Sequence, residues 1–221
     1  MNTDLAYVPP PDTGLDIVFA DASLIVANKP SGLLSVPGRG AAKADCLARR
    51  VQREFPEALI VHRLDMETSG LIVLARNPAM HQQLSIAFQN RQVEKRYVAM
   101  VAGELPEGEG EIDLPLIADW PRRPLQKVDH VLGKPSLTRY RRLAYDAADD
   151  SSRVLLEPQT GRSHQLRVHL MSIGHPILGD VLYASPAQQA KSPRLLLHAE
   201  SLAFAHPCSG VPLTLTAAAP F

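Results

Sequence analysis

The alternation of apolar and polar positions predicts many short strands with three interspersed helices. Residues 71–75 form an uninterrupted, partly β-branched apolar run, which is typical of a buried strand. Apolar residues at helical spacing predict helices over 41–55, 78–92 and from about 160 to 173. Further strands are predicted at 15–20, 24–28, 95–101, 136–145, 153–158, 194–199, 202–205 and 213–216.

Local signals sharpen some of these boundaries. Asn77 followed by Pro78 predicts the start of the second helix, and Gly174 predicts the end of the third. Residues 1–14 are polar and proline-rich and are predicted to form a tail, whereas 112–135 is predicted to be irregular. Because no break in composition divides the remainder, we predict one α+β domain over 15–221 with a mixed, largely antiparallel sheet.

Composition narrows the class of protein only a little. The 221 residues are 45% hydrophobic and 21% charged, and the formal net charge is zero, so any surface for nucleic acid must be local. The two cysteines, Cys46 and Cys208, lie in no CxxC motif, which argues against a zinc site or a disulfide framework. Neither a signal peptide nor an apolar run near the ~20 residues of a membrane span is present, so a cytoplasmic protein without membrane contact is expected.

Asp65 is the strongest candidate for chemistry. It lies in a polar, turn-prone stretch, His62 to Gly70, that leads directly into the predicted strand 71–75. Reactive side chains often lie on loops held by a rigid sheet, although most loop aspartates are turn residues. A reactive carboxylate needs a basic partner to keep it ionised and oriented, and Arg167, on the polar side of the third helix, is a candidate that sequence alone does not place beside it.

Two aromatic residues have both a structural and a functional interpretation. Tyr97 follows two cations on a predicted strand and could be a core residue or could stack on a base. Trp120 lies beside Arg122 and Arg123 in the irregular segment, which favours a contact surface for RNA. The other basic clusters, at 91–96, 139–142 and 191–194, would permit one positive stripe.

Several common site motifs are missing from the sequence. His164 and His169 are five residues apart, whereas a helical metal site needs four-residue spacing, so both are expected to pack or to form hydrogen bonds. No GxSxG, GxGxxG or GxxxxGK[ST] motif occurs, which leaves nucleophilic serine and nucleotide cofactors without support.

Six segments, in order, resemble the motifs of the RluA family of pseudouridine synthases. The stretch His62-Arg63-Leu64-Asp65, continued by Thr68 to Leu71, resembles the family's catalytic motif. The other segments are 28–33, 94–97, 161–169, 174–180 and 196–199. Six ordered motifs are far more specific than one short match. The resemblance covers the chain from about Leu15 to its C-terminus, and it implies a catalytic domain with an active-site cleft across the sheet.

Two more segments narrow the resemblance. Residues 33–39 and 119–124 resemble the founding, dual-specificity member of the family, which has no N-terminal S4 domain, and this chain also leaves no room for one. The implied partners are RNA alone, namely 23S rRNA and the tRNA anticodon stem-loop, and the implied state is a monomer. The only noted departure is Ala75-Arg76-Asn77, where many relatives have Ala-Lys-Thr.

The resemblance also implies roles for individual residues. Asp65 would be the nucleophile, Arg167 its ion-pair partner, and Tyr97 the residue that stacks on uracil. Leu166 would pack near the base, and Arg63 would fill the place of the extruded nucleotide. Further contacts with RNA are expected from His62, Arg162, Trp120, Arg122 and Arg123.

The implied reaction is an isomerisation that moves the uridine C1′ bond from N1 to C5. Nothing is oxidised and no group is carried away, so no cofactor or metal is expected. Asp65 could act covalently or through a glycal-type intermediate, and the sequence leaves both routes open. Two alternatives also stay open, a relative that acts on only one of the RNAs and a catalytically idle RNA-binding module.

Overall fold

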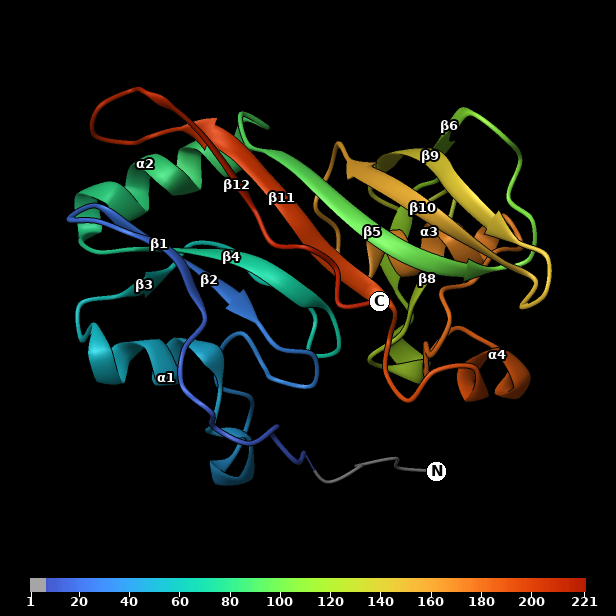
Figure 1. Cartoon of the computed structure of the whole chain (residues 1–221), viewed down its shortest axis with the longest axis horizontal. Helices are drawn as coiled ribbons and strands as arrows, with labels where there is room; N and C mark the ends of the chain where they lie inside the picture. The colour runs from blue at the N-terminus through green and yellow to red at the C-terminus, as the bar shows by residue number, and fades with distance from the viewer. Residues whose placement is uncertain (1–6) are drawn as a thin grey trace. The chain divides into compact units, whose positions relative to one another are not determined.

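The computed structural model describes residues 7–221, which fall into two compact units (Figure 1). The first unit comprises the described residues up to Val93 together with Ser201–Ala218, and the second comprises Glu94–Glu200 and the last three residues. Both units combine antiparallel strands with helices, so the predicted α+β class is confirmed.

The first unit is organised around the strand β4 (Ser69–Ala75), in which every residue is buried. Antiparallel pairings join β1 to β2, β2 and β3 to β4, and β12 to residues 201–205 of β11. The other elements are β1 (Ile17–Ala20), β2 (Leu24–Lys29), η1 (Ala41–Lys43), α1 (Leu47–Glu54), β3 (Leu59–Ile60), α2 (Pro78–Gln89), β11 (Leu197–Ala205) and β12 (Pro212–Thr216).

The uninterrupted apolar run is explained by burial on both faces of β4. Leu71 and Val73 belong to a core cluster that includes Leu84 of α2, whereas Ile72 belongs to a second cluster that includes Val51 of α1. Successive side chains of a strand point to opposite faces, so each face of β4 has its own core. The predicted strand is therefore confirmed, and it begins two residues earlier.

The first predicted helix begins late. The prediction placed it over 41–55, but α1 begins at Leu47, after the short η1 and an extended Cys46. The amides of Leu47 and Ala48 donate to carbonyls of the loop at Leu34 and Ser35. These long-range acceptors satisfy the free N–H groups of the first turn and set the start of the helix. By contrast, the predicted cap of α2 is confirmed, because the Asn77 side chain accepts a hydrogen bond from the Met80 amide.

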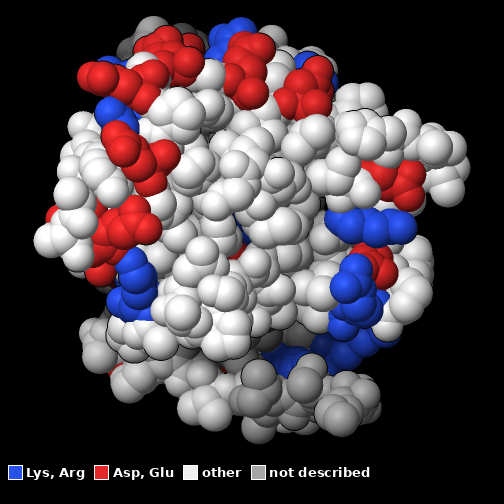
Figure 2. Space-filling model, turned by 90° about the vertical axis from the view of Figure 1, so that its right-hand side faces the viewer, with Lys and Arg blue, Asp and Glu red and all other residues white. Residues whose placement is uncertain are grey.

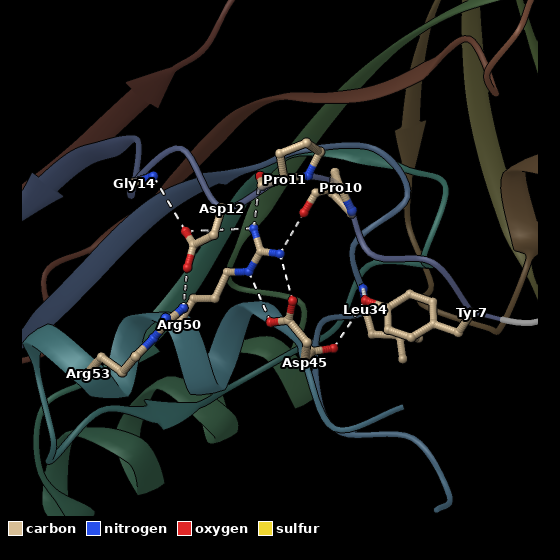
Figure 3. Close-up of polar contacts among 9 residues, drawn as sticks. All are labelled: Tyr7, Pro10, Pro11, Asp12, Gly14, Leu34, Asp45, Arg50 and Arg53. Carbon is tan, nitrogen blue, oxygen red and sulfur yellow. Dashed lines mark hydrogen bonds and ion pairs between the residues drawn. The ribbon is translucent and has the colours of Figure 1, made fainter. Parts of the chain in front are cut away.

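The described part of the expected tail, residues 7–14, is fastened to α1 (Figure 3). Arg50, only 5% exposed, donates to two proline carbonyls of this segment and forms an ion pair with Asp45. Its hydrogen bonds lower the pKa of the Asp45 carboxyl. The Tyr7 hydroxyl donates to the Asp45 carbonyl and accepts from the Leu34 amide. Residues 1–6 of the expected tail lie outside the described residues.

The second unit is built on an antiparallel sheet in the order β5-β10-β9-β6. Tyr97, Ala99 and Val101, alternate residues of β5, contribute to one core cluster, because alternate side chains of a strand share a face. The elements of this unit are β5 (Glu94–Ala102), β6 (Glu109–Asp113), β7 (Leu116–Ala118), η2 (Trp120–Arg122), β8 (Gln126–Val128), β9 (Leu137–Asp146), β10 (Ser151–Pro158), α3 (Gln165–Ser172) and α4 (Pro186–Ala190).

Two predictions about the later chain were wrong. The segment 112–135 is not irregular, because β7 and β8 pair as a two-stranded ribbon and Lys134 pairs with Leu116 on its other side. The two strands predicted at 194–199 and 202–205 are one continuous strand, β11. Glu200 and Ser201, which separate the two predicted strands, are half-buried residues within β11.

His169 is a buried histidine, as expected for a packing residue. Its Nε2 lies 3.0 Å from the Leu114 carbonyl oxygen and its Nδ1 lies 2.9 Å from the Thr138 hydroxyl. The carbonyl can only accept, so Nε2 carries the proton and Nδ1 accepts from the hydroxyl. This arrangement fits a neutral ring, and burial lowers the pKa of His169.

Acid should therefore weaken the fold through His169. Because the unfolded chain binds this proton at higher pH than the folded chain, stability is full above about pH 6.5 and falls below it. The slope should approach about 1.4 kcal/mol per pH unit until the folded group itself titrates. Urea unfolding from pH 8 to about pH 5 measures it, with His169→Gln expected to flatten the curve. The exposed His130→Gln is the matched control, and an equal slope in all three proteins would contradict this assignment.

Candidate active site

Asp65 lies on the loop between β3 and β4, as the sequence predicts. Its side chain is half-buried, and its carbonyl accepts a hydrogen bond from the Thr68 amide at 3.2 Å. Thr68 is itself buried, at 2% exposed. Asp65 is thus part of a turn, and that turn leads directly into the fully buried strand β4. A turn residue in this position can also carry a reactive side chain, so the two interpretations of Asp65 are compatible.

A neighbouring loop fixes the chain directly before Asp65. The Ser35 hydroxyl donates to the Leu64 carbonyl at 2.7 Å and accepts from the Leu64 amide at 3.1 Å. Ser35 is 4% exposed and Leu64 is 8% exposed, so water does not compete for these bonds. One side chain therefore satisfies both main-chain groups of the residue that precedes Asp65.

The same loop fixes the chain directly after Asp65. The Lys29 ammonium, completely buried, donates to the Met66 carbonyl at 2.9 Å and to two carbonyls of its own loop. The Gly32 amide also donates to the Met66 carbonyl, and the Ser31 hydroxyl donates to the Glu67 carbonyl at 2.6 Å. We call Lys29, Ser31, Gly32 and Ser35 the loop clasp, because they hold main-chain groups on both sides of Asp65.

Removing one member of the loop clasp should slow the isomerisation that the resemblance implies. In Ser35→Ala the buried Leu64 amide and carbonyl lose their partner, and an unsatisfied buried polar group costs about 1–3 kcal/mol. We expect kcat to fall about tenfold or more, with RNA affinity unchanged, because the substitution loosens the position of Asp65. Steady-state kinetics with saturating RNA, alongside a binding titration, measure both quantities.

A matched control for this variant is Ser209→Ala, which removes a hydroxyl from a different loop of the same unit. It should leave kcat unchanged. A weaker RNA affinity with an unchanged kcat in Ser35→Ala would contradict a positioning role for the clasp.

His62 and Arg63 begin the Asp65 loop in different ways. His62 accepts a hydrogen bond from the Val73 amide at its Nε2, and its ring stacks on Phe88 at a centroid distance of 4.4 Å. These contacts fix the start of the loop to β4 and α2. Arg63 is exposed. The expected contact of His62 with RNA stays a prediction. The expected contact of Arg63 with RNA also stays a prediction, and the exposed side chain is compatible with it.

Tyr97 and Leu166 lie in the second unit and are brought together there. Leu166 of α3 is 7% exposed and belongs to the core cluster against which the partly buried Tyr97 packs. Tyr97 pairs with Leu156 of the neighbouring strand β10, which fixes its backbone. The two residues expected to touch the base thus share one apolar environment.

Arg167 is buried rather than on a polar helix face. It is 2% exposed, and its Nε and Nη2 donate to the two carboxylate oxygens of Asp180 at 2.8 and 2.6 Å. Every residue of α3 from 165 to 170 is buried, so the predicted polar side of the helix is wrong. The arginine is held in a bidentate pair within the second unit, and its pairing with Asp65 stays a prediction.

Tyr183 contacts both the pair Arg167–Asp180 and the two-stranded ribbon of β7 and β8. The Arg167 guanidinium lies 5.2 Å from the Tyr183 ring centroid, and the Asp180 carboxylate accepts from the Tyr183 amide. The Tyr183 hydroxyl contacts His164 Nδ1 at 2.6 Å and accepts from the Gln126 amide at 2.9 Å. The start of β8 is therefore anchored to the pair Arg167–Asp180.

The turn between β7 and β8 presents the expected RNA-contacting residues. Trp120 is 65% exposed, and the Arg123 guanidinium lies over its ring. Arg122 forms an ion pair with the buried Asp119. Arg162, exposed at the start of the α3 region, donates to the Pro135 carbonyl. All four residues lie in the second unit.

Other basic clusters are largely neutralised by ion pairs. Arg139 pairs with Glu111, Arg142 with Glu104, and Arg96 with Glu157. On the face in Figure 2, acidic side chains gather toward the upper left, while a group of lysines and arginines lies at the lower right. The predicted positive stripe is thus smaller than expected, because the arginines of the cluster at 139–142 form ion pairs with glutamates.

Sequence reasoning assigned no role to several residues that hold the site. Lys29, Ser35 and Asp180 lie in segments that resemble motifs of the family, at 28–33, 33–39 and 174–180, but the resemblance gave no role to any of them, and Tyr183 lies just after the last segment. The available signal was a lysine at the end of an apolar strand, directly before Pro30 and Gly32. Among residues 7–221, no group of three or more His, Cys, Asp or Glu side chains is arranged to hold a metal ion.

Comparison with known proteins identifies the family of this chain. The family model described as RNA pseudouridylate synthase matches residues 23–172, which include Asp65, Tyr97 and Arg167. This chain belongs to that family and is an RNA pseudouridine synthase, an isomerase. Within residues 7–221, no helix is long and apolar enough to cross a membrane.

Individual relatives are similar over nearly the whole chain. The dual-specificity RNA pseudouridine synthase RluA of Escherichia coli K12 is 53% identical over 215 residues, 97% of this chain and 98% of that protein. The RluA of Vibrio parahaemolyticus is 51% identical over 208 residues, 93% of this chain and 83% of that protein. The solved structure of human RNA pseudouridylate synthase domain containing 1 has a TM-score of 0.80 and 31% identity, covering 97% of this chain and 87% of that one.

Proposed function

We propose that this pseudouridine synthase has two substrates, a loop uridine of 23S rRNA and a uridine of the tRNA anticodon stem-loop. The observation that supports it is the similarity, over 97% of the chain, to proteins named dual-specificity synthases. We further propose that residues 15–221 form the catalytic domain, and that the protein acts as a cytoplasmic monomer without a cofactor.

The proposed chemistry begins with extrusion of the target uridine, which costs a few kcal/mol. The bond from C1′ to N1 then breaks, the uracil turns, and a bond from C1′ to C5 forms, with the C5 proton lost and N1 left protonated. Asp65 is the proposed nucleophile, and a carboxylate suits either the covalent or the glycal route. The loop clasp supports this role, because it fixes the backbone on both sides of Asp65.

The proposed contacts with the base come from the second unit. Tyr97 would stack on the uracil, and its partly buried position in an apolar cluster with Leu166 supports this. Arg167 would keep Asp65 ionised, as the sequence motif implies. Its bidentate bond with Asp180 supports a fixed, permanently charged guanidinium.

The proposed contacts with the RNA backbone come from exposed cations. Arg63 would occupy the place of the extruded nucleotide, and its exposed side chain suits that role. Trp120 is largely exposed and would stack on a base, and the Arg123 guanidinium over its ring would add a cation beside that base. His62, Arg122 and Arg162 are the remaining proposed contacts.

Mapping pseudouridines in cells that lack this protein tests the two substrates. We expect one pseudouridine to disappear from 23S rRNA and one from the tRNA anticodon stem-loop, with both restored by the wild-type gene. Loss from only one RNA would instead support the single-substrate alternative. If both modifications persist in the deleted strain, the proposed substrates are wrong.

A further inference from the structure

The turn that follows β8, residues 129–133, exposes two neighbouring aliphatic side chains. Val131 is 89% exposed and Leu132 is 71% exposed, and no other two adjacent large hydrophobics in residues 7–221 are exposed to this extent. Adjacent apolar side chains held in water indicate a contact surface more often than scattered single ones. We call Val131 and Leu132 the apolar tip.

The turn beneath the apolar tip is rigid. The Asp129 carboxylate accepts from the amides of Val131 and Leu132 at 3.1 and 3.0 Å, and the Gly133 amide donates to the Asp129 carbonyl at 2.9 Å. A Cβ at Gly133 would lie 2.2 Å from that carbonyl oxygen, so only glycine allows this close approach. These hydrogen bonds fix the backbone that carries Val131 and Leu132. A fixed backbone loses less conformational entropy when the two side chains bind a partner.

The surroundings of the apolar tip favour a polyanion as its partner. Residues 120–136 carry four lysines or arginines and one aspartate. That aspartate, Asp129, is engaged by backbone amides and by Lys127. Lys134, on the other side of the tip, is exposed and has no carboxylate partner among residues 7–221. A protein partner would need a matching acidic surface around an apolar centre, whereas RNA supplies both phosphates and apolar base faces.

The ribbon that carries the apolar tip has RNA-type side chains at both ends. The turn at 119–125, with Trp120 and Arg123, joins β7 to β8 at one end, and the apolar tip follows β8 at the other. The three-residue strand between them spans about 10 Å. The start of β8 is anchored by the Tyr183 hydroxyl, so contacts at either end would be held in a fixed relation.

We propose that Val131 and Leu132 form an apolar wedge that packs against unstacked bases of the RNA substrate. Aliphatic side chains act in this way where proteins separate stacked bases, and RNA is read largely at bases that have left the helix. This inference rests on the proposed function for one point, the choice of the tRNA anticodon stem-loop as the RNA. It adds a contact that none of the expected site residues supplies.

The test compares RNA affinity as a function of salt concentration. The probes are a transcribed tRNA anticodon stem-loop and a fully paired RNA duplex, and the variant is V131S/L132S in the full chain. We expect about tenfold weaker binding to the stem-loop, with an unchanged salt dependence and an unchanged affinity for the duplex. The variant K127Q/K134Q should instead reduce the salt slope by about 1.5, because it removes phosphate contacts.

Two controls separate the possible outcomes. V211S changes another exposed aliphatic residue, in the first unit, and should leave both affinities unchanged. The thermal midpoint of V131S/L132S should equal that of the wild type, since the side chains are exposed. Equal affinity of the variant and the wild type for the stem-loop would overturn the proposed wedge. The proposal would also be overturned if the wild type formed a dimer that V131S/L132S abolished while RNA binding stayed the same. A wild-type protein that binds the stem-loop but forms no pseudouridine in it would instead contradict the proposed substrate.

Discussion

Replacing Asp65 with asparagine is expected to abolish pseudouridine formation while RNA binding persists. The amide has nearly the same shape, but it is neither a nucleophile nor a base, and loss of such a group costs at least about 10⁴-fold in kcat. The loop should keep its conformation, because the loop clasp holds main-chain groups of Leu64, Met66 and Glu67 rather than the Asp65 side chain. Tritium release from RNA labelled at uridine C5 measures activity, and a filter-binding titration measures affinity.

The matched control for Asp65→Asn is Asp16→Asn. Asp16 is a carboxylate of the same unit whose side chain accepts from Asn28, and its removal should leave turnover unchanged. Full activity in Asp65→Asn would contradict the assignment of Asp65 as the nucleophile. A joint loss of activity and RNA binding would show that the substitution disturbs the loop, and Asp65→Glu would then be needed to separate charge from position.

Replacing Asp180 with alanine is expected to produce the largest loss of stability. Asp180 is completely buried and accepts two bonds from Arg167, so its removal takes both of these acceptors away from a buried guanidinium charge. Breaking a buried ion pair on one side typically costs about 3–5 kcal/mol. The variant also loses acceptors for the amides of Leu182 and Tyr183. Urea unfolding at neutral pH measures the change in free energy of unfolding.

An exposed ion pair offers the comparison. Glu111 and Arg139 pair at 2.8 Å with both side chains more than half exposed, and such pairs contribute about 0–1 kcal/mol. Glu111→Ala should therefore be nearly silent in the same experiment. If Asp180→Ala and Glu111→Ala cost the same, the pair Arg167–Asp180 does not stabilise the second unit, and its role in orienting Arg167 would have to be reconsidered.

Local patterns predicted those parts of the fold that depend on local physics. The strand 71–75 followed from an apolar run, and the start of α2 followed from Asn77 and Pro78, whose capping contact lies within three residues. The paired strands β9 and β10 are joined by a short polar turn and were predicted for the same reason. The six motifs then implied roles for Asp65, Tyr97 and Arg167, which local reasoning had left as candidates with a structural alternative.

The remaining features depend on contacts between residues far apart in sequence. Lys29 and Met66 are separated by 37 residues, so the local sequence shows a lysine at the end of an apolar strand but does not show which carbonyl its ammonium binds. Arg167 was placed on a polar helix face because an arginine is usually exposed, and the burial reflects Asp180, 13 residues later. The ribbon of β7 and β8 has strands of only three residues, too short for an alternating pattern to be read.

The loop clasp has a consequence for how such an enzyme can change over time. Because Ser31, Ser35 and Lys29 bind main-chain groups, these contacts do not require particular side chains at Leu64, Met66 or Glu67. We therefore expect that the exposed Arg63 can be exchanged without moving the Asp65 carboxylate. Substitutions at exposed positions of this loop, such as Arg63, should change RNA recognition without changing the proposed chemistry. A library randomised at these positions should therefore contain many active variants.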